Sequence, residues 1–104
     1  MPRVMSNASA ACDDLVLTGE ITTTGVAELR ERLRQQLATA PVCVIHADEV
    51  TQLDAAGAQL LYAFVTERAR RGGSVRWASA SLYLVEAARM LGMTQHLGLT
   101  DHVS

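Results

Sequence analysis

The spacing of apolar side chains predicts strands that alternate with helices along the chain. Apolar residues are consecutive from Leu15 to Leu17 and from Val42 to Ala47, and they alternate with polar residues from Ser74 to Trp77. Both patterns are typical of β-strands. The run at 42–47 is apolar on both faces apart from His46, which favours a central strand of a parallel sheet. We therefore expect regular structure to begin at Asp14.

Between these strands the apolar period changes to that of an α-helix. The first expected helix follows Thr24, its expected N-cap, and ends near Pro41. The second follows Asp54 and ends at the Gly72-Gly73 pair, and the third begins after Ser81 and ends at the next glycine. The faces that we expect to be buried consist of Val26, Leu29, Leu33, Leu37, Leu60, Leu61, Phe64, Val65, Leu84, Val85, Ala88 and Leu91.

This order of elements predicts a single α/β domain. We expect a central, mostly parallel sheet of four to five strands with helices packed on it. Residues 14–104 form the domain, and residues 1–13 are expected to be a flexible lead-in or a weak edge strand. The segment from Asp48 to Asp54 is expected to be a connection between the central strand and the second helix.

Composition and charge exclude several function classes. Hydrophobic residues make up 49% of the 104 residues but aromatic residues only 4%, so the core must be aliphatic and rich in alanine. The longest apolar runs are far shorter than the roughly 20 residues of a membrane-spanning helix, which argues against direct membrane insertion. A formal net charge of −2 gives no field for a nucleic acid. Two cysteines and no secretory signal favour a reducing cytoplasm.

Motifs of catalysis, metal binding and cofactor binding are absent from the sequence. It has no G-x-S-x-G elbow, phosphate-binding loop, C-x-x-C or H-E-x-x-H, so we expect neither an enzyme, a metal site nor a cofactor. His46 and Asp48 could act as a base and its orienting acid only if the strand continues through Asp48. Cys43 lies in an apolar run and is interpreted as a buried thiol. The expected second helix ends with three arginines, Arg68, Arg70 and Arg71. Their positive charges either stabilise the negative end of the helix dipole or form a partner-binding patch.

Five short motifs, in order along the chain, resemble the STAS domain family. They are L-T-G-E-I-T from Leu17, V-C-V-I-H-A-D-E-V-T-Q-L-D-A-A-G followed by A-Q-L-L from Val42, G-G-S-V-R-W from Gly72, A-S-A-S, and A-A-R-M-L-G-M from Ala87. This family includes bacterial anti-sigma-factor antagonists and the cytoplasmic domains of sulphate transporters. The resemblance covers about Leu15 to Leu99.

The resemblance implies a partner-binding surface that lacks the family's regulatory hydroxyl. Regulated members are phosphorylated on a Ser or Thr just before the motif glycine, where this chain has Ala55 and Ala56. Asp54 matches the motif aspartate, and Thr22 replaces another aspartate of the family. The surface that we expect to bind a partner consists of Thr22, Asp54, Ala55, Ala56, Gly57, Ala58 and Ser81. Asp54 also has a simpler interpretation, as a helix cap alone.

The resemblance implies a non-enzymatic interaction module. The partners that it implies are a kinase-type anti-sigma factor, a chemotaxis or two-component protein, or the ATPase of a phospholipid-transport ABC complex. Formation of a homodimer by this chain stays open as well. Two alternatives stay open: phosphorylation of another hydroxyl, Thr51 or Ser81, and a small nucleotide-binding protein.

Overall fold

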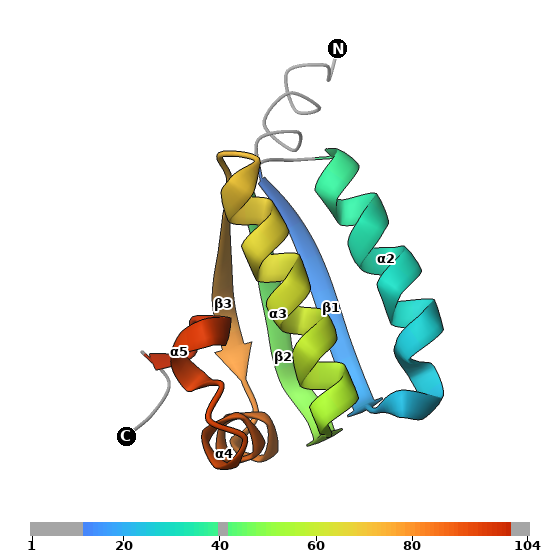
Figure 1. The fold of residues 1–104 in the computed structure, drawn as a ribbon, viewed down its shortest axis with the longest axis vertical. Coiled ribbons are helices and arrows are strands. Elements are labelled where there is room, and N and C mark those ends of the chain that lie inside the picture. The colour runs from blue at the N-terminus through green and yellow to red at the C-terminus, as the bar shows by residue number, and fades with distance from the viewer. Residues whose placement is uncertain (1–11, 40–41, 101–104) are drawn as a thin grey trace.

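A computed structural model describes residues 12–39 and 42–100 as one layered α/β unit (Figure 1). The elements in chain order are β1 (Cys12–Ile21), the 3-10 turn η1 (Thr23–Gly25), α2 (Val26–Thr39), β2 (Val42–Leu53), α3 (Ala55–Arg70), β3 (Ser74–Ala80), α4 (Leu82–Met90) and α5 (Thr94–Leu97). No helix among the described residues is both long and apolar enough to cross a membrane.

The sheet is parallel with β2 at its centre, as the sequence predicts. Its order is β1-β2-β3, so the strands advance in one direction across the sheet. Both crossover helices, α2 and α3, therefore lie side by side on the same face (Figure 1). The described residues form three strands, fewer than the four to five that we expect for the whole sheet. β1 begins at Cys12, and the rest of the expected lead-in lies outside the described residues.

The central strand is longer than the sequence indicates, and the expected connection at 48–54 is wrong. β2 continues to Leu53, and its second half pairs with the end of β1. Two register shifts each insert one extra residue into β2, so buried side chains recur every third residue, at Ala47, Val50 and Leu53. The second half of β2 cannot be recognised from the sequence, because buried residues of a regular strand recur every second residue and not every third.

The core lies between the sheet and the helices, and most of the expected helix faces are buried. The largest fully buried side chains are Leu17, Ile45, Leu61, Leu84, Leu97, Leu99, Val50 and Cys43. Leu91 is an exception: it is exposed because α4 ends at Met90 and Leu91 is its C-cap. The indole Nε1 of Trp77 donates a 2.7 Å hydrogen bond to the carbonyl of Leu97, which fastens α5 to β3.

The helix ends agree with the expected caps except at α2. Asp54 caps α3 and Ser81 caps α4 through their side chains. Thr24 does not cap α2, because the chain passes through η1 and the backbone N–H of Gly25 donates to the carbonyl of Thr22 at 3.0 Å.

The arginines at the end of α3 do not form one exposed cluster. Arg68 is 2% exposed, and its Nη2 donates a 2.6 Å hydrogen bond to the backbone carbonyl of Gln36 in α2. Arg70 and Arg71 pair with Glu67 on their own helix, at 3.6 and 3.0 Å. Cys43 is buried as expected, with its Sγ 3.6 Å from the side-chain oxygen of Gln36.

Candidate functional site

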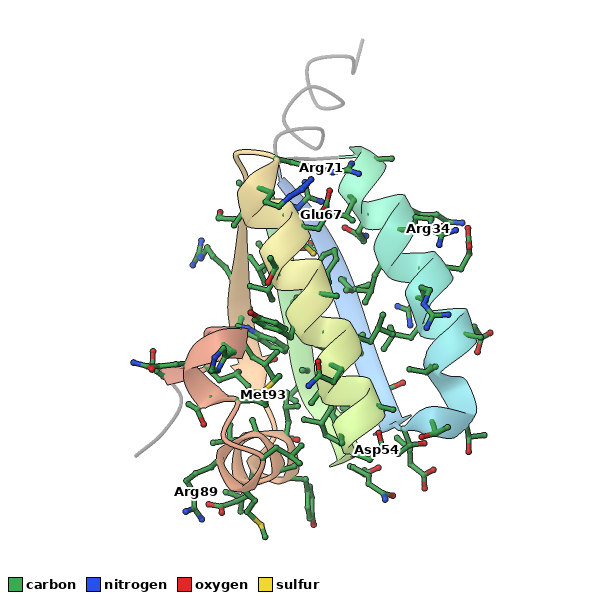
Figure 2. The ribbon with its side chains drawn as sticks, viewed as in Figure 1. Arg34, Asp54, Glu67, Arg71, Arg89 and Met93 are labelled. Carbon is green, nitrogen blue, oxygen red and sulfur yellow. The ribbon has the colours of Figure 1, made fainter. Side chains whose placement is uncertain are left out.

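Each of three residues expected at the site follows the end of a strand. Thr22 follows β1, Asp54 follows β2 and Ser81 follows β3, and all three strands run in the same direction. Figure 2 shows Asp54 where α3 begins. Ser81 is not level with it, since its hydroxyl donates to the carbonyl of Val50 at 2.6 Å. Val50 lies four residues before Asp54, about 13 Å along a strand.

The carboxylate of Asp54 joins two connections that are 31 residues apart in sequence. Its Oδ1 accepts a 2.9 Å hydrogen bond from the backbone N–H of Gly57, in the first turn of α3. Its Oδ2 accepts from the backbone N–H of Thr23 at 3.0 Å and from the Thr23 hydroxyl at 3.2 Å. Asp54 therefore caps α3 and also holds η1 against it. We call Thr22, Thr23 and residues 54–57 the Asp54 turn.

These hydrogen bonds stabilise the charged form of Asp54. They hold the pKa of the carboxyl below its ordinary value, with the bond from the Gly57 amide contributing most and the bond from the Thr23 amide next. The positive end of the α3 dipole acts in the same direction. Asp54 is therefore an ionised cap at neutral pH, with both oxygens occupied by groups of its own chain.

Gly57 has a second role, because α3 begins in direct contact with the end of β1. A Cβ atom at Gly57 would collide with the carbonyl oxygen of Ile21 and would lie 2.8 Å from the Cγ2 atom of Ile21. The same carbonyl accepts a 3.2 Å hydrogen bond from the backbone N–H of Asp54. Only a residue without a side chain permits this approach, which explains the glycine of the motif.

The surface of the turn is smaller than expected. Ala55 is exposed and Ala56 is half-buried, so both are accessible. Gly57 and Ala58 are buried, and Ala58 is only 1% exposed. The expectation that all four form a contact surface is wrong for these two, since they face the core on the inner side of α3. They shape the turn, and the accessible part of its α3 side is the alanine pair.

Ser81 lies beside α4 rather than in the Asp54 turn. Its hydroxyl oxygen accepts a 3.1 Å hydrogen bond from the backbone N–H of Leu84 and donates to Val50, so a phosphate on it would remove the proton that it donates to Val50. Exposed apolar side chains follow it on α4: Leu82 is 70% and Met90 81% exposed. The other proposed acceptor, Thr51, is exposed on β2.

Sequence reasoning missed two parts of the site. Thr23, and not Thr22, binds Asp54, and the only signal was the run of three threonines. A cavity of about 120 Å³ also opens next to Thr22, between the end of β1 and the start of α2. Its lining residues include two acidic ones, Glu20 and Glu28, and the basic Arg32.

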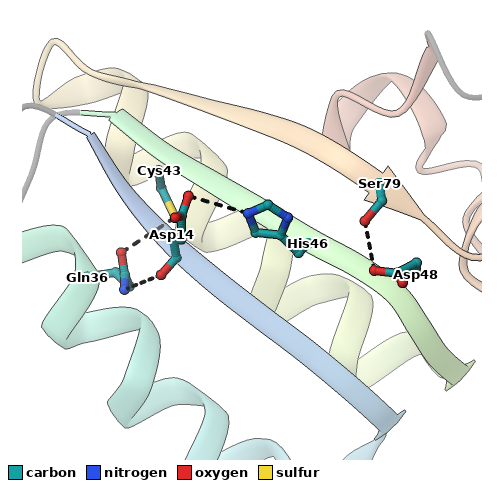
Figure 3. A network of polar contacts seen from close by, with 6 residues as sticks. All are labelled: Asp14, Gln36, Cys43, His46, Asp48 and Ser79. Carbon is teal, nitrogen blue, oxygen red and sulfur yellow. Dashed lines mark hydrogen bonds and ion pairs between the residues drawn. The ribbon is translucent and has the colours of Figure 1, made fainter. Parts of the chain in front are cut away.

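The histidine and aspartate of β2 share one face but do not contact each other in a catalytic pair. The strand continues through Asp48, and His46 Nε2 lies 3.3 Å from Oδ1 of Asp14 on β1 (Figure 3). Asp48 accepts a 2.9 Å hydrogen bond from the hydroxyl of Ser79 on β3. These contacts link neighbouring strands. Within residues 12–39 and 42–100, no group of three or more His, Cys, Asp or Glu side chains could hold a metal ion.

Comparison with known proteins finds matches to one family and one fold. Residues 4–101 match the protein family described as Mlab, STAS domain. Among curated proteins, none matches this sequence. The structure of the anti-sigma factor antagonist SpoIIAA in its unphosphorylated form is similar, with a TM-score of 0.68, 14% identity, and coverage of 83% of this chain and 76% of that chain. A sulfate transporter family protein from Wolinella succinogenes has a TM-score of 0.68 and 22% identity, with coverage of 84% and 71%.

Proposed function

This chain belongs to the STAS domain family, and we propose that it is a non-enzymatic interaction module of the anti-sigma-factor antagonist type. It binds a regulatory protein partner through the Asp54 turn and the adjoining start of α3. The observation that carries this proposal is the double attachment of Asp54, which fixes the connection after β1 and the start of α3 as one rigid surface. A surface that is already ordered loses little conformational entropy on binding.

The alanine pair makes this surface receptive to a partner in all conditions. Ala55 and Ala56 present small apolar groups where the family resemblance implies a hydroxyl that accepts phosphate. A phosphate would add about −1.5 to −2 charges and would repel or displace a partner. Because neither alanine can be phosphorylated, the module binds without a switch at this turn.

The residues that line the cavity beside Thr22 favour a partner with a positively charged side chain. Two of its lining residues, Glu20 and Glu28, are acidic, against the single basic residue Arg32. Arg32 already donates a 2.7 Å hydrogen bond from its Nη2 to the carbonyl of Val16. We therefore expect a basic side chain of the partner to bind in this cavity beside Thr22, where its charge is attracted by the two glutamates.

Capture of the partner by the Ala56→Glu variant tests this function. We expect roughly tenfold weaker binding or more, because a carboxylate at the contact must lose its hydration without gaining a partner. The variant should fold, since an acidic residue is favoured in the first turn of a helix. The measurement is co-purification of the products of adjacent genes with the native chain and the variant, followed by titration of the protein recovered.

Ala69→Glu is the matched control, because Ala69 is exposed on the last turn of the same helix. It should capture the partner as the native chain does. If Ala56→Glu binds every recovered partner as tightly as Ala69→Glu, the Asp54 turn is not the contact surface. An ABC-transporter ATPase recovered in place of an anti-sigma factor or a two-component protein would identify the alternative partner class at the same surface.

A further inference from the structure

A second surface lies between the two helices that cover the sheet. A groove of about 210 Å³ runs between α2 and α3, and we call it the α2–α3 groove. The residues that line it are Arg30, Leu33, Arg34, Leu37, Leu60, Ala63 and Phe64. Figure 2 shows Arg34 projecting from α2, the helix that forms one wall. The groove is separate from the Asp54 turn, with which it shares no lining residue.

The groove reaches the core because one of its wall residues is small. Leu33 and Phe64 are buried members of the core, whereas Leu37 and Leu60 are half-buried against it. Ala63 is exposed on α3, and its methyl group leaves open the space that a longer side chain would cover. Because Leu33 and Phe64 are each 3% exposed, the accessible apolar surface of the groove lies mainly on Leu37 and Leu60.

The size and chemistry of the groove favour protein side chains over a small ligand. Pockets for cofactors and drug-sized ligands have volumes of roughly 300–1,000 Å³ and several converging polar groups. The α2–α3 groove is smaller, and its apolar lining is interrupted only by two arginines, both on α2. One or two large apolar side chains fit this space, as when an amphipathic helix binds in a groove.

The two arginines determine the charge of the occupant. Arg30 and Arg34 are four residues apart on α2, so they lie one above the other on the same side of the groove. Arg34 pairs with Glu31 at 3.7 Å, but both side chains are largely exposed, and such a pair is weak. Among the described residues, no salt bridge involves Arg30. The rim is therefore positive beside an apolar floor.

We propose that the α2–α3 groove binds an acidic amphipathic helix of a protein partner. Two apolar side chains of that helix, one turn apart, enter the space next to Ala63 and contact Leu33 and Leu60. Carboxylates that flank them pair with Arg30 and Arg34. This gives the chain a second contact surface that does not depend on the Asp54 turn.

Methyl NMR of the 104-residue chain, labelled at leucine, tests the proposal with a synthetic probe. The probe is a helical peptide of about 18 residues with leucines at i and i+4 flanked by glutamates, and its matched control has lysine at each glutamate. We expect saturable shifts of the Leu33, Leu37 and Leu60 methyl signals with the acidic peptide alone. The Arg30→Glu, Arg34→Glu double variant should bind it at least about tenfold more weakly.

The control double variant is Arg76→Glu, Arg89→Glu, which changes the net charge equally at two exposed positions outside the groove. It should bind the acidic peptide more tightly than the groove variant, and Ala56→Glu should bind it as the native chain does. Two results of the peptide titration would overturn the proposal: no shift up to about 1 mM peptide, or equal shifts with the lysine peptide. Two other results would also overturn it. The first is a shift of these methyl signals when the chain alone is concentrated, and the second is a shift with anionic phospholipid vesicles but not with peptide.

Discussion

The Gly57→Ala variant is expected to unfold roughly 10 °C below the native chain. Its added methyl group would collide with the carbonyl oxygen of Ile21, a backbone atom that is held by the hydrogen bond from Asp54. Such overpacking costs about 1–3 kcal/mol, and each kcal/mol shifts the Tm of a domain of this size by about 4–8 °C. The gain in helix propensity from glycine to alanine offsets only part of this cost. Thermal unfolding followed by circular dichroism measures the difference.

The Gly25→Ala variant is the control for this effect. Gly25 ends η1 with an ordinary negative φ, and no atom lies within 4 Å of the position that its Cβ would take. This substitution should leave the Tm within a few degrees of the native value or raise it slightly, because alanine restricts the unfolded chain. If both variants show the same Tm, α3 does not contact the end of β1 as closely as described.

The stability that Asp54 contributes should disappear in acid. Its pKa is lowered in the folded chain, chiefly by the hydrogen bonds from the amides of Gly57 and Thr23. The unfolded chain therefore binds more protons near and below the ordinary value of 3.8, so the contribution is complete above that value and is lost as the pH falls through the lower, folded pKa. The loss is measured as the free energy of unfolding in urea, for the native chain and for the Asp54→Asn variant, from pH 7 down to pH values below the folded pKa of Asp54.

We expect the native chain to be more stable than Asp54→Asn at neutral pH, with the gap closing only in acid. Asparagine preserves the shape of the cap but removes the charge. The pKa of Glu67 is also lowered in the folded chain, chiefly by the hydrogen bond from Arg71, so Glu67→Gln is measured in parallel. A gap that stays constant across the pH range would contradict the charged role of Asp54.

The periodicity of the sequence predicts the elements well, but not the features that depend on contacts between distant segments. The bounds of α3 and α4 follow from their apolar faces, their caps at Asp54 and Ser81 and the glycines behind them. The second half of β2 could not be recognised, because two bulges replace alternation with a spacing of three. A bulge depends on the neighbouring strand, which a single sequence does not show.

The same holds for the candidate site: the sequence identifies the motif, but not the contacts between distant segments. The family resemblance located Asp54 and the alanine pair, but the contact between Thr23 and Asp54 could not be predicted, because only the folded chain brings η1 and α3 together. The burial of Ala58 also depends on how α3 is rotated against the sheet. Local sequence therefore identifies the motif, whereas packing determines which of its residues are accessible.

The central claim is that a partner contacts the alanine pair of the Asp54 turn. The most direct test is NMR of the chain with 13C-labelled alanine methyl groups, titrated with the protein that co-purifies with it. We expect the signals of Ala55 and Ala56 to shift or broaden as the complex forms, while those of Ala69 and Ala78, exposed on other parts of the structure, stay unchanged. Changes at Ala69 or Ala78 with none at Ala55 and Ala56 would contradict the account.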